Sequence, residues 1–263
     1  MDTLFPPPAE VCSRSGAVAA AGAPPCPFSP PVQDRVDALD WQRVEEDLNG
    51  EGWAHLPRLL APGECDAIAA LYEEEIFRSR VVMARHGFGR GEYRYFAYPL
   101  PAIVETLRAG LYARLAPVAN HWNALMGIGP RYPQRLEEFL ARCHHAGQSR
   151  PTPLLLRYGA GDYNCLHQDL YGEHVFPLQA AILLAEPGRD FDGGELVLTE
   201  QRPRRQSRAA VVPLRQGDGV VFAVNQRPVR GARGCYRVAM RHGVSRVRRG
   251  SRHTLGMIFH DAA

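Results

Sequence analysis

The chain has 263 residues, 45% of them hydrophobic, and a formal net charge of +3 at pH 7, as expected of a globular protein with a sizeable core. No stretch reaches the ~18 apolar residues of a membrane span, and the short Ala-rich run at 16–23 makes a poor signal peptide. Every one of the 31 basic residues is an arginine, which excludes chemistry that needs a Schiff-base lysine or a P-loop lysine.

Residues 1–35 are rich in proline and alanine and poor in large apolar side chains, so we predict a disordered extension there. The next region, 36–150, shows helical periodicity and short strands, and we interpret it as a support region of the same domain as the rest of the chain. Its expected elements are a helix at 40–48 that ends at Asn49-Gly50, a strand at 52–57, a helix at 61–74, a hairpin or loop over a barrel mouth at 81–98, and helices at 101–125 and 133–145.

The pattern changes in residues 151–263, where short strands alternate with turns that contain Gly, Pro and Asp. Strands of this length and spacing predict a double-stranded β-helix, or jelly roll. The expected fold class is therefore an all-β core with flanking helices (α+β), backed by the N-terminal helices. The expected strands are 153–158, 163–168, 177–184, 194–199, 210–214, 219–223, 235–242 and 253–259.

A small set of residues in this region suits metal chemistry. His167 and Asp169 are two residues apart, so that on a strand they would point to the same face. With His242 they would make two imidazoles and one carboxylate, a set that can hold Fe(II) and leave open positions. Arg252 follows, and its guanidinium can bind a carboxylate through two hydrogen bonds.

The order of these residues resembles the 2-oxoglutarate- and Fe(II)-dependent oxygenases, and their surroundings resemble the prolyl-hydroxylase-like branch. The similarity covers about the C-terminal 40% of the chain, 152–260, and depends on several motifs in the same order. These motifs are R-Y-x-x-G at 157–161, H-x-D at 167–169, D-G-G-x-L at 192–196, G-D-x-x-x-F at 217–222, H-x-V-x-x-V at 242–247 and G-x-R-x-x-L at 250–255.

The resemblance implies an enzyme with Fe(II), 2-oxoglutarate and O2, in which oxidative decarboxylation to succinate and CO2 accompanies hydroxylation of an unidentified small molecule or protein side chain. His167, Asp169 and His242 would be the metal ligands and the catalytic centre. Arg252 would bind 2-oxoglutarate, with help from Thr254, Tyr158 and Gln179. Tyr158 can equally be a core aromatic residue whose hydroxyl finds a partner.

The six cysteines are scattered without a C-x-x-C pair, which argues against a zinc ribbon and a disulfide scaffold. Reduced cysteines favour a cytoplasmic protein, and we expect no membrane association. Cys165 shares a strand face with His167 if the strand alternates regularly, so it could line the pocket, but we interpret it as a small packing residue.

Arginines are concentrated between Glu200 and Arg252, and one expected loop carries Arg202, Arg204, Arg205 and Arg208. Such a loop can bind a nucleic acid, an acidic protein or an anionic metabolite. A solvated surface loop is the simpler interpretation. Two alternatives to the hydroxylase remain: a nucleic-acid-binding or repair oxygenase that uses this loop, and a non-catalytic sensor of metal or 2-oxoglutarate.

Overall fold

The computed structural model describes residues 30–129, 132–170, 172–232 and 234–263. Most of the predicted extension lies outside these residues, and helix α1 (Val32–Asp37) begins within its last part. None of the helices in the described ranges is long and apolar enough to cross a membrane.

Helix α2 (Trp41–Glu51) continues through Asn49-Gly50, where the sequence predicted its end. The Asp40 side chain caps its first turn by accepting from Arg43 N, and Gly52 ends it at φ 81°. Tertiary contacts explain the extra residues, because Asn49 and Gly50 both offer their carbonyl oxygens to the buried guanidinium of Arg227. These bonds satisfy carbonyls at the helix end that would otherwise need water.

The rest of the N-terminal half follows the expected order of elements. A strand and a helix come first, β1 (Trp53–Leu56) and α3 (Pro62–Ala70), followed by a 3-10 turn, η1 (Leu71–Glu73). The segment predicted as a hairpin or loop forms a hairpin, β2 (Phe77–Val82) with β4 (Glu92–Phe96), and its long connection holds η2 (Met83–Arg85) and β3 (Gly89–Arg90). The two predicted long helices are α4 (Ala102–Met126) and α5 (Leu136–His145).

All eight strands predicted for the C-terminal half are present. They are β5 (Leu154–Tyr158), β6 (Tyr163–His167), β7 (Leu178–Leu183), β9 (Leu196–Gln201), β10 (Arg208–Val212), β11 (Gly219–Ala223), β13 (Gly234–Val244) and β15 (Arg252–Ile258). Three further strands were not predicted: β8 (Phe191–Gly193), β12 (Gln226–Gly231) and β14 (Val247–Gly250).

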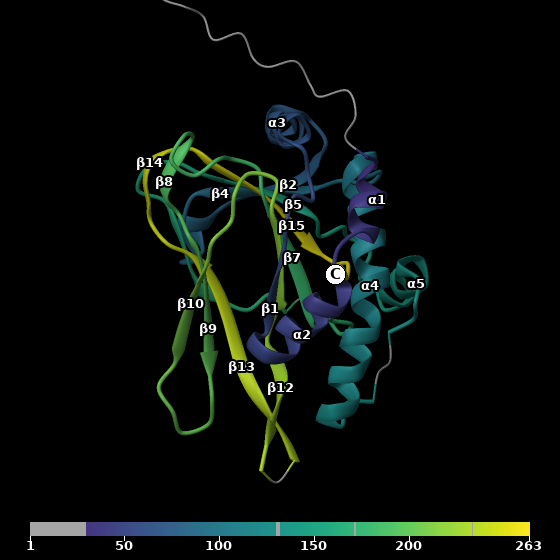
Figure 1. Cartoon of the computed structure of the whole chain (residues 1–263). Helices are drawn as coiled ribbons and strands as arrows, with labels where there is room; N and C mark the ends of the chain where they lie inside the picture. The colour runs from purple at the N-terminus through teal and green to yellow at the C-terminus, as the bar shows by residue number, and fades with distance from the viewer. Residues whose placement is uncertain (1–29, 130–131, 171, 233) are drawn as a thin grey trace, which may run out of the picture.

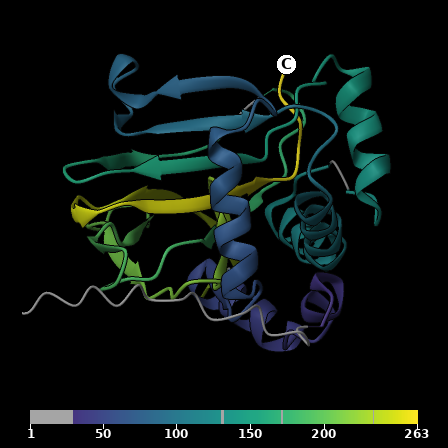
Figure 2. The same cartoon turned by 90° about the horizontal axis from the view of Figure 1, so that it is seen from above.

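Two antiparallel sheets form the core of the protein. The larger sheet has the order β1-β11-β7-β15-β5-β4-β2, and the smaller has the order β10-β9-β13-β6-β3, with β12 paired to β13. The smaller sheet lies on one side of the larger sheet, and helices α4 and α5 lie on the other (Figure 1). Figure 2 shows the hairpin β2–β4 side by side with β5 and β15. The predicted jelly roll backed by N-terminal helices is therefore confirmed.

The support region and the C-terminal half share one sheet, since β1, β2 and β4 pair directly or through each other with strands after residue 151. This pairing supports the interpretation of 36–150 as part of the same domain. The exact division at residues 35 and 150 stays a prediction.

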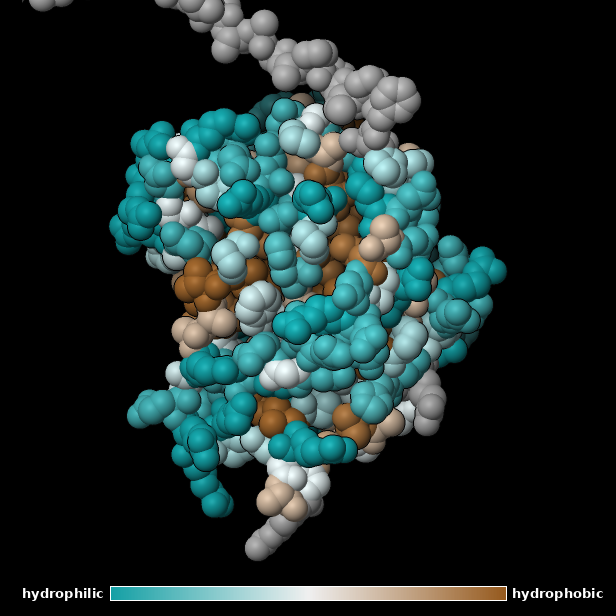
Figure 3. Space-filling model, in the orientation of Figure 1, coloured by the Kyte–Doolittle hydropathy of each residue, from teal (hydrophilic) through white to brown (hydrophobic). Residues whose placement is uncertain are grey.

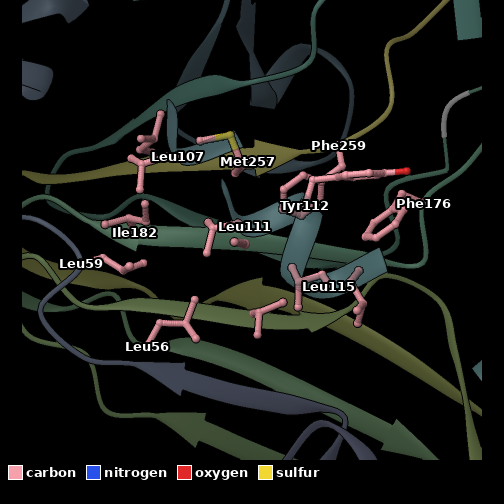
Figure 4. Packing of buried hydrophobic residues seen from close by; sticks show 14 of the residues in the cluster. Leu56, Leu59, Leu107, Leu111, Tyr112, Leu115, Phe176, Ile182, Met257 and Phe259 are labelled. Atoms are coloured by element: carbon pink, nitrogen blue, oxygen red, sulfur yellow. The ribbon is translucent and has the colours of Figure 1, made fainter. Parts of the chain in front are cut away.

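Strand β15 separates two environments by simple alternation. Leu255 and Met257 belong with Leu111 and Leu115 of α4 to one large apolar cluster, and Figure 4 shows Met257 beside these helix residues. Each such leucine, once buried, stabilises the fold by about 2 kcal/mol. Arg252 and Thr254 have the opposite direction and line a cavity between the sheets. The polar residues of β15 therefore face the space where chemistry can occur.

Candidate functional site

The three predicted metal ligands meet between the sheets. His242 on β13 pairs with His167, the last residue of β6, and their ring centroids are 4.1 Å apart. Asp169 follows β6 and places its carboxylate 3.5 Å from His167 Nε2 and 3.3 Å from His242 Nε2. All three ligand atoms lie within 4.8 Å of one another. Two imidazoles and a carboxylate at this spacing fit a ferrous ion.

A β-bulge in β6 shapes this site. Val244 pairs with Asn164 and His242 pairs with His167, so two residues of β6 stand opposite the single residue Gly243. Asn164 and His167 both line the cavity, whereas Cys165 and Leu166 are exposed. The expectation that Cys165 shares a face with His167 is therefore wrong. So is the picture of His167 and Asp169 on one strand, because β6 ends before Asp169.

Hydrogen bonds fix the orientation of His167 and the chain that follows it. His167 Nδ1 donates to the carbonyl oxygen of Cys165 at 2.8 Å, which leaves Nε2 for a metal. The Gln168 amide donates to Met240 O at 2.8 Å and to Asn225 Oδ1 at 2.9 Å. These bonds hold the loop against β13, so that the carboxylate of Asp169 is directed toward the two imidazoles.

The electrostatics of this cluster suit a cation. Burial disfavours the charged form of Asp169, but hydrogen bonds from His167 and His242 outweigh it and hold the pKa of the carboxyl well below its usual range. Burial lowers the pKa of His242, which keeps that imidazole neutral and able to act as a ligand. For His167, the hydrogen bond with Asp169 overcomes the effect of burial and raises the pKa. Metal binding would replace that proton.

Arg252 lines the same cavity and gives one part of it a positive charge, although its side chain is only 3% exposed. Its Nη1 donates to Thr254 Oγ1 at 2.6 Å, and its guanidinium lies 5.5 Å from the Tyr158 ring centroid and 6.0 Å from that of Phe191. Within the described ranges, Arg252 Nε has no hydrogen-bond partner, and the buried Tyr158 hydroxyl interacts with the side chain of Asn164. A buried guanidinium without a carboxylate is costly. These donors fit the carboxylate of a bound co-substrate.

Gln179, which the resemblance suggested as a helper in 2-oxoglutarate binding, lies beside the metal cluster. It is 6% exposed, and its Nε2 lies 3.1 Å from Nε2 of His242. The amide oxygen Oε1 has no partner among the residues that the structure describes. This amide is therefore available to a ligand in the cavity, on the metal side rather than near Arg252.

The cavity has a volume of about 230 Å³ and several walls that the sequence did not predict. Tyr93 and Tyr95 on β4 line it with their rings edge to face, 5.4 Å apart. Burial raises the pKa of Tyr93, so its hydroxyl stays protonated. Phe88, 48% exposed, stands at the opening. The alternating aromatic residues at 93 and 95 were the available signal, and the segment was expected near the barrel mouth without a role for its side chains.

The predicted arginine loop lies between β9 and β10, on the hydrophilic hairpin at the lower left of Figure 3. Two of its four arginines form ion pairs with carboxylates. Arg202 pairs with the buried Glu200 at 2.6 Å, and Arg208 pairs with Glu51 at 2.7 Å. Glu200 also pairs with the buried Arg227. Only Arg204 and Arg205 have no ion pair within the described part of the chain, so the loop is less basic than its sequence indicates.

Comparisons with known proteins agree with these observations. The Oxygenase-NA family model, described as "Oxygenase, catalysing oxidative methylation of damaged DNA", matches residues 91–262, more than half of the chain. Two uncharacterised Mycobacterium tuberculosis proteins, Rv2227 of strain H37Rv and MT2286 of strain CDC 1551, are each 51% identical over 168 residues. These matches cover 64% of this chain and 72% of the relatives.

Solved structures share the fold at low sequence identity. A 2OG-Fe(II) oxygenase family oxidoreductase from Burkholderia pseudomallei is 18% identical with a TM-score of 0.50, over 86% of this chain and 94% of that one. A Trichoplax adhaerens prolyl hydroxylase, solved with a hypoxia-inducible-factor peptide, is 15% identical with a TM-score of 0.52, over 86% and 90%. The His–Asp–His cluster of this chain lies in a jelly roll of the kind that these solved enzymes share. The chain therefore belongs to the Oxygenase-NA family.

Proposed function

We propose that the chain is a hydroxylating dioxygenase in which His167, Asp169 and His242 hold the iron and Arg252 binds the distal carboxylate of 2-oxoglutarate. The observation that carries this proposal is a buried guanidinium in the same cavity as the His–Asp–His cluster, without a carboxylate partner in the described ranges. When bound, the iron couples oxidative decarboxylation of 2-oxoglutarate to oxidation of a C–H bond.

The side chains around the cavity would bind and orient 2-oxoglutarate. Arg252 and the Tyr158 hydroxyl donate to the distal carboxylate, and Thr254 holds the guanidinium in place through the bond to Nη1. Apolar side chains around them, among them Leu156 and Val244, exclude water and strengthen these charged contacts. The amide of Gln179 beside His242 would contact either the co-substrate or the reacting group.

For the substrate, we propose a methylated base in DNA. Support comes from the family description, which names damaged DNA. Hydroxylation of an N-methyl carbon gives an N-hydroxymethyl group, which leaves as formaldehyde and restores the N–H, so one oxidation removes the methyl group. The likeness to prolyl hydroxylases concerns the fold and gives no support to a peptide substrate.

The test measures succinate and formaldehyde from an oligodeoxynucleotide that carries an N-methylated base, with the unmethylated strand and a proline-containing peptide as controls. We expect both products from the methylated strand with the wild-type chain and neither with Asp169→Asn. Turnover with the peptide alone would refute the substrate. Tight Fe(II) and 2-oxoglutarate binding without succinate from any substrate would favour the sensor.

A separate measurement tests the site without a substrate. Anaerobic Fe(II) and 2-oxoglutarate should give a weak visible charge-transfer band in the wild type. In Arg252→Ala the band should need much more 2-oxoglutarate. Unchanged 2-oxoglutarate dependence in the variant would remove Arg252 from the co-substrate site.

A further inference from the structure

A group of arginines on the smaller sheet and its edge has no acidic partner. Arg85, Arg90, Arg241 and Arg246 are all exposed, and none pairs with a carboxylate within the described ranges. We call these four residues the basic rim. They contrast with Arg202 and Arg208 of the β9–β10 loop, which are held by Glu200 and Glu51.

The strand register brings three of these arginines to one face. Arg90 on β3 pairs with Tyr163 on β6, and the guanidinium of Arg246 lies 5.8 Å from the centroid of the same tyrosine ring. Arg241 on β13 alternates with the inward-facing His242, so its side chain leaves the sheet on the outer side. Arg90 on β3 and Arg241 on β13 therefore lie on either side of β6, and Arg246 follows the end of β13. Neighbouring strands are about 4.8 Å apart.

The carboxylates nearest in sequence to this face are engaged elsewhere. Asp162, just before Tyr163, accepts a hydrogen bond from Gly159 N at 2.8 Å. Glu195 accepts from the hydroxyl of Ser245, next to Arg246. Neither of these carboxylates forms an ion pair with a rim arginine within the described ranges.

An exposed aromatic pair connects this face to the cavity. His86 and Phe88 stack with ring centroids 5.3 Å apart and an interplanar angle of 22°. The carbonyl oxygen of Phe88 accepts from Cys165 N at 2.9 Å, which attaches this segment to the edge of β6. Phe88 is 48% exposed and lines the opening of the cavity that holds the metal cluster. Phe88 therefore borders the cavity and precedes Arg90 of the rim by two residues.

We propose that the basic rim binds the phosphates of a single-stranded nucleic acid, while His86 and Phe88 stack a base next to the one that reacts. Regularly spaced cations with interleaved aromatic rings are how proteins bind unpaired strands. The inference rests on the proposed DNA substrate. It assigns binding to the sheet face and the β3 edge rather than to the β9–β10 loop.

The experiment is a fluorescence-anisotropy titration with an unmethylated, labelled single strand of about 16 nucleotides. Two double variants remove the same charge from different places: Arg90→Gln/Arg246→Gln from the rim and Arg204→Gln/Arg205→Gln from the loop. We expect the rim variant to bind about 10-fold more weakly. Its slope of log K against log salt should fall by about 1.4, since each lost phosphate contact contributes about 0.7. The loop variant should bind as the wild type does.

A second pair of variants tests the stacking. Phe88→Ala and Phe88→Leu should both weaken binding by about 5-fold or more, because leucine keeps the apolar surface but cannot stack on a base. Val211→Ala changes an apolar residue of similar exposure, 58%, on β10 and serves as the control. Thermal unfolding of each variant checks its fold. If the double glutamine variant is unstable, Arg90→Lys/Arg246→Lys replaces it; this variant keeps the charge and should retain most of the affinity.

Several results would overturn the inference. Equal losses in the rim and loop variants would mean diffuse attraction, and a loss confined to the loop variant would move the site to the β9–β10 hairpin. Preference for a fully paired duplex would remove the stacking role. Each of these leaves the turnover assay unaffected. Conversely, binding at the rim without formaldehyde release would keep this surface and reject the proposed demethylation.

Discussion

Arg252 and Thr254 lie two residues apart on the same face of β15, and the guanidinium donates to the hydroxyl at 2.6 Å. Both side chains are almost fully buried. This bond uses one nitrogen of the guanidinium, while Nε has no partner within the described ranges, so an anion in the cavity that Arg252 lines can accept from it.

Arg252→Lys should therefore weaken 2-oxoglutarate binding. Lysine keeps the charge but cannot donate two parallel hydrogen bonds and reach Thr254 as well. Loss of a charged hydrogen bond costs about 1.5–3 kcal/mol, so the Kd for 2-oxoglutarate should rise about 10- to 100-fold in isothermal titration calorimetry. Arg249→Lys is the matched control, because Arg249 is exposed and pairs with Asp192. Similar losses in both variants would contradict the assignment.

Metal binding should stabilise the fold through the His–Asp–His cluster. At 100 times the Kd, a metal that binds only the folded chain adds about 2.7 kcal/mol to the free energy of unfolding. We expect Mn(II), used as a redox-stable substitute, to raise the Tm of the wild type but not of Asp169→Asn. The measurement is thermal unfolding with and without the metal. An equal rise in His167→Ala would show that the ion binds elsewhere.

Glu200 should be a centre of stability rather than of function. Its side chain is buried, at 4% exposed, and pairs with Arg202 and Arg227. Arg227 is also buried and donates a hydrogen bond to the carbonyl oxygen of Asn49 near the end of α2. Removing one partner of a buried pair costs about 3–5 kcal/mol, so Glu200→Gln should lose about that much in urea unfolding. Glu51→Gln breaks an exposed pair with Arg208 and should cost less than about 1 kcal/mol. Equal costs would mean that burial of Glu200 is not what matters.

Asp218 should make stability depend on pH. Burial opposes its ionisation, but hydrogen bonds from His55, Arg58 N and Arg215 N outweigh that effect and hold its pKa below the ordinary value. A depressed folded-state pKa contributes stability that is present above the unfolded pKa of about 3.9 and lost as pH falls through the folded pKa.

Asp218→Asn should accordingly destabilise the protein by about 1.5–3 kcal/mol at pH 7. The difference from wild type should shrink as the pH is lowered below about 4. Unfolding free energies of both chains across this range check the prediction. A difference that stays constant with pH would assign the effect to packing instead of charge.

The sequence was sufficient where one local pattern decides the outcome. Strand β11 and helix α4 follow from continuous apolar periodicity, and the meeting of His167, Asp169 and His242 follows from motif spacing. The sequence was insufficient where contacts between residues far apart in the chain determine the structure. Strand β12 contains Pro228, which argues against a strand, yet it pairs with β13 outside the main path of the sheet, where proline is tolerated.

The site shows the same division between local and distant causes. Tyr93 and Tyr95 have no motif of their own and reach the cavity only because β4 joins β5 in the larger sheet. The ion pair that engages Arg208 comes from Glu51 at the end of α2, which lies far from it in the sequence. Neither arrangement can be read from spacing alone, which is why the loop looked more basic than it is.

The bulge in β6 has a consequence for chain length. Asn164 and His167 are an odd number of positions apart, so a straight strand would turn one of them to the outside. The additional residue reverses that parity and lets both face the cavity. Shortening the segment by either Cys165 or Leu166 would restore even spacing and a flat ladder with the histidine still inside. Adding one residue would also restore even spacing, but it would leave three residues of β6 opposite the single residue Gly243, so this stretch tolerates a deletion better than an insertion.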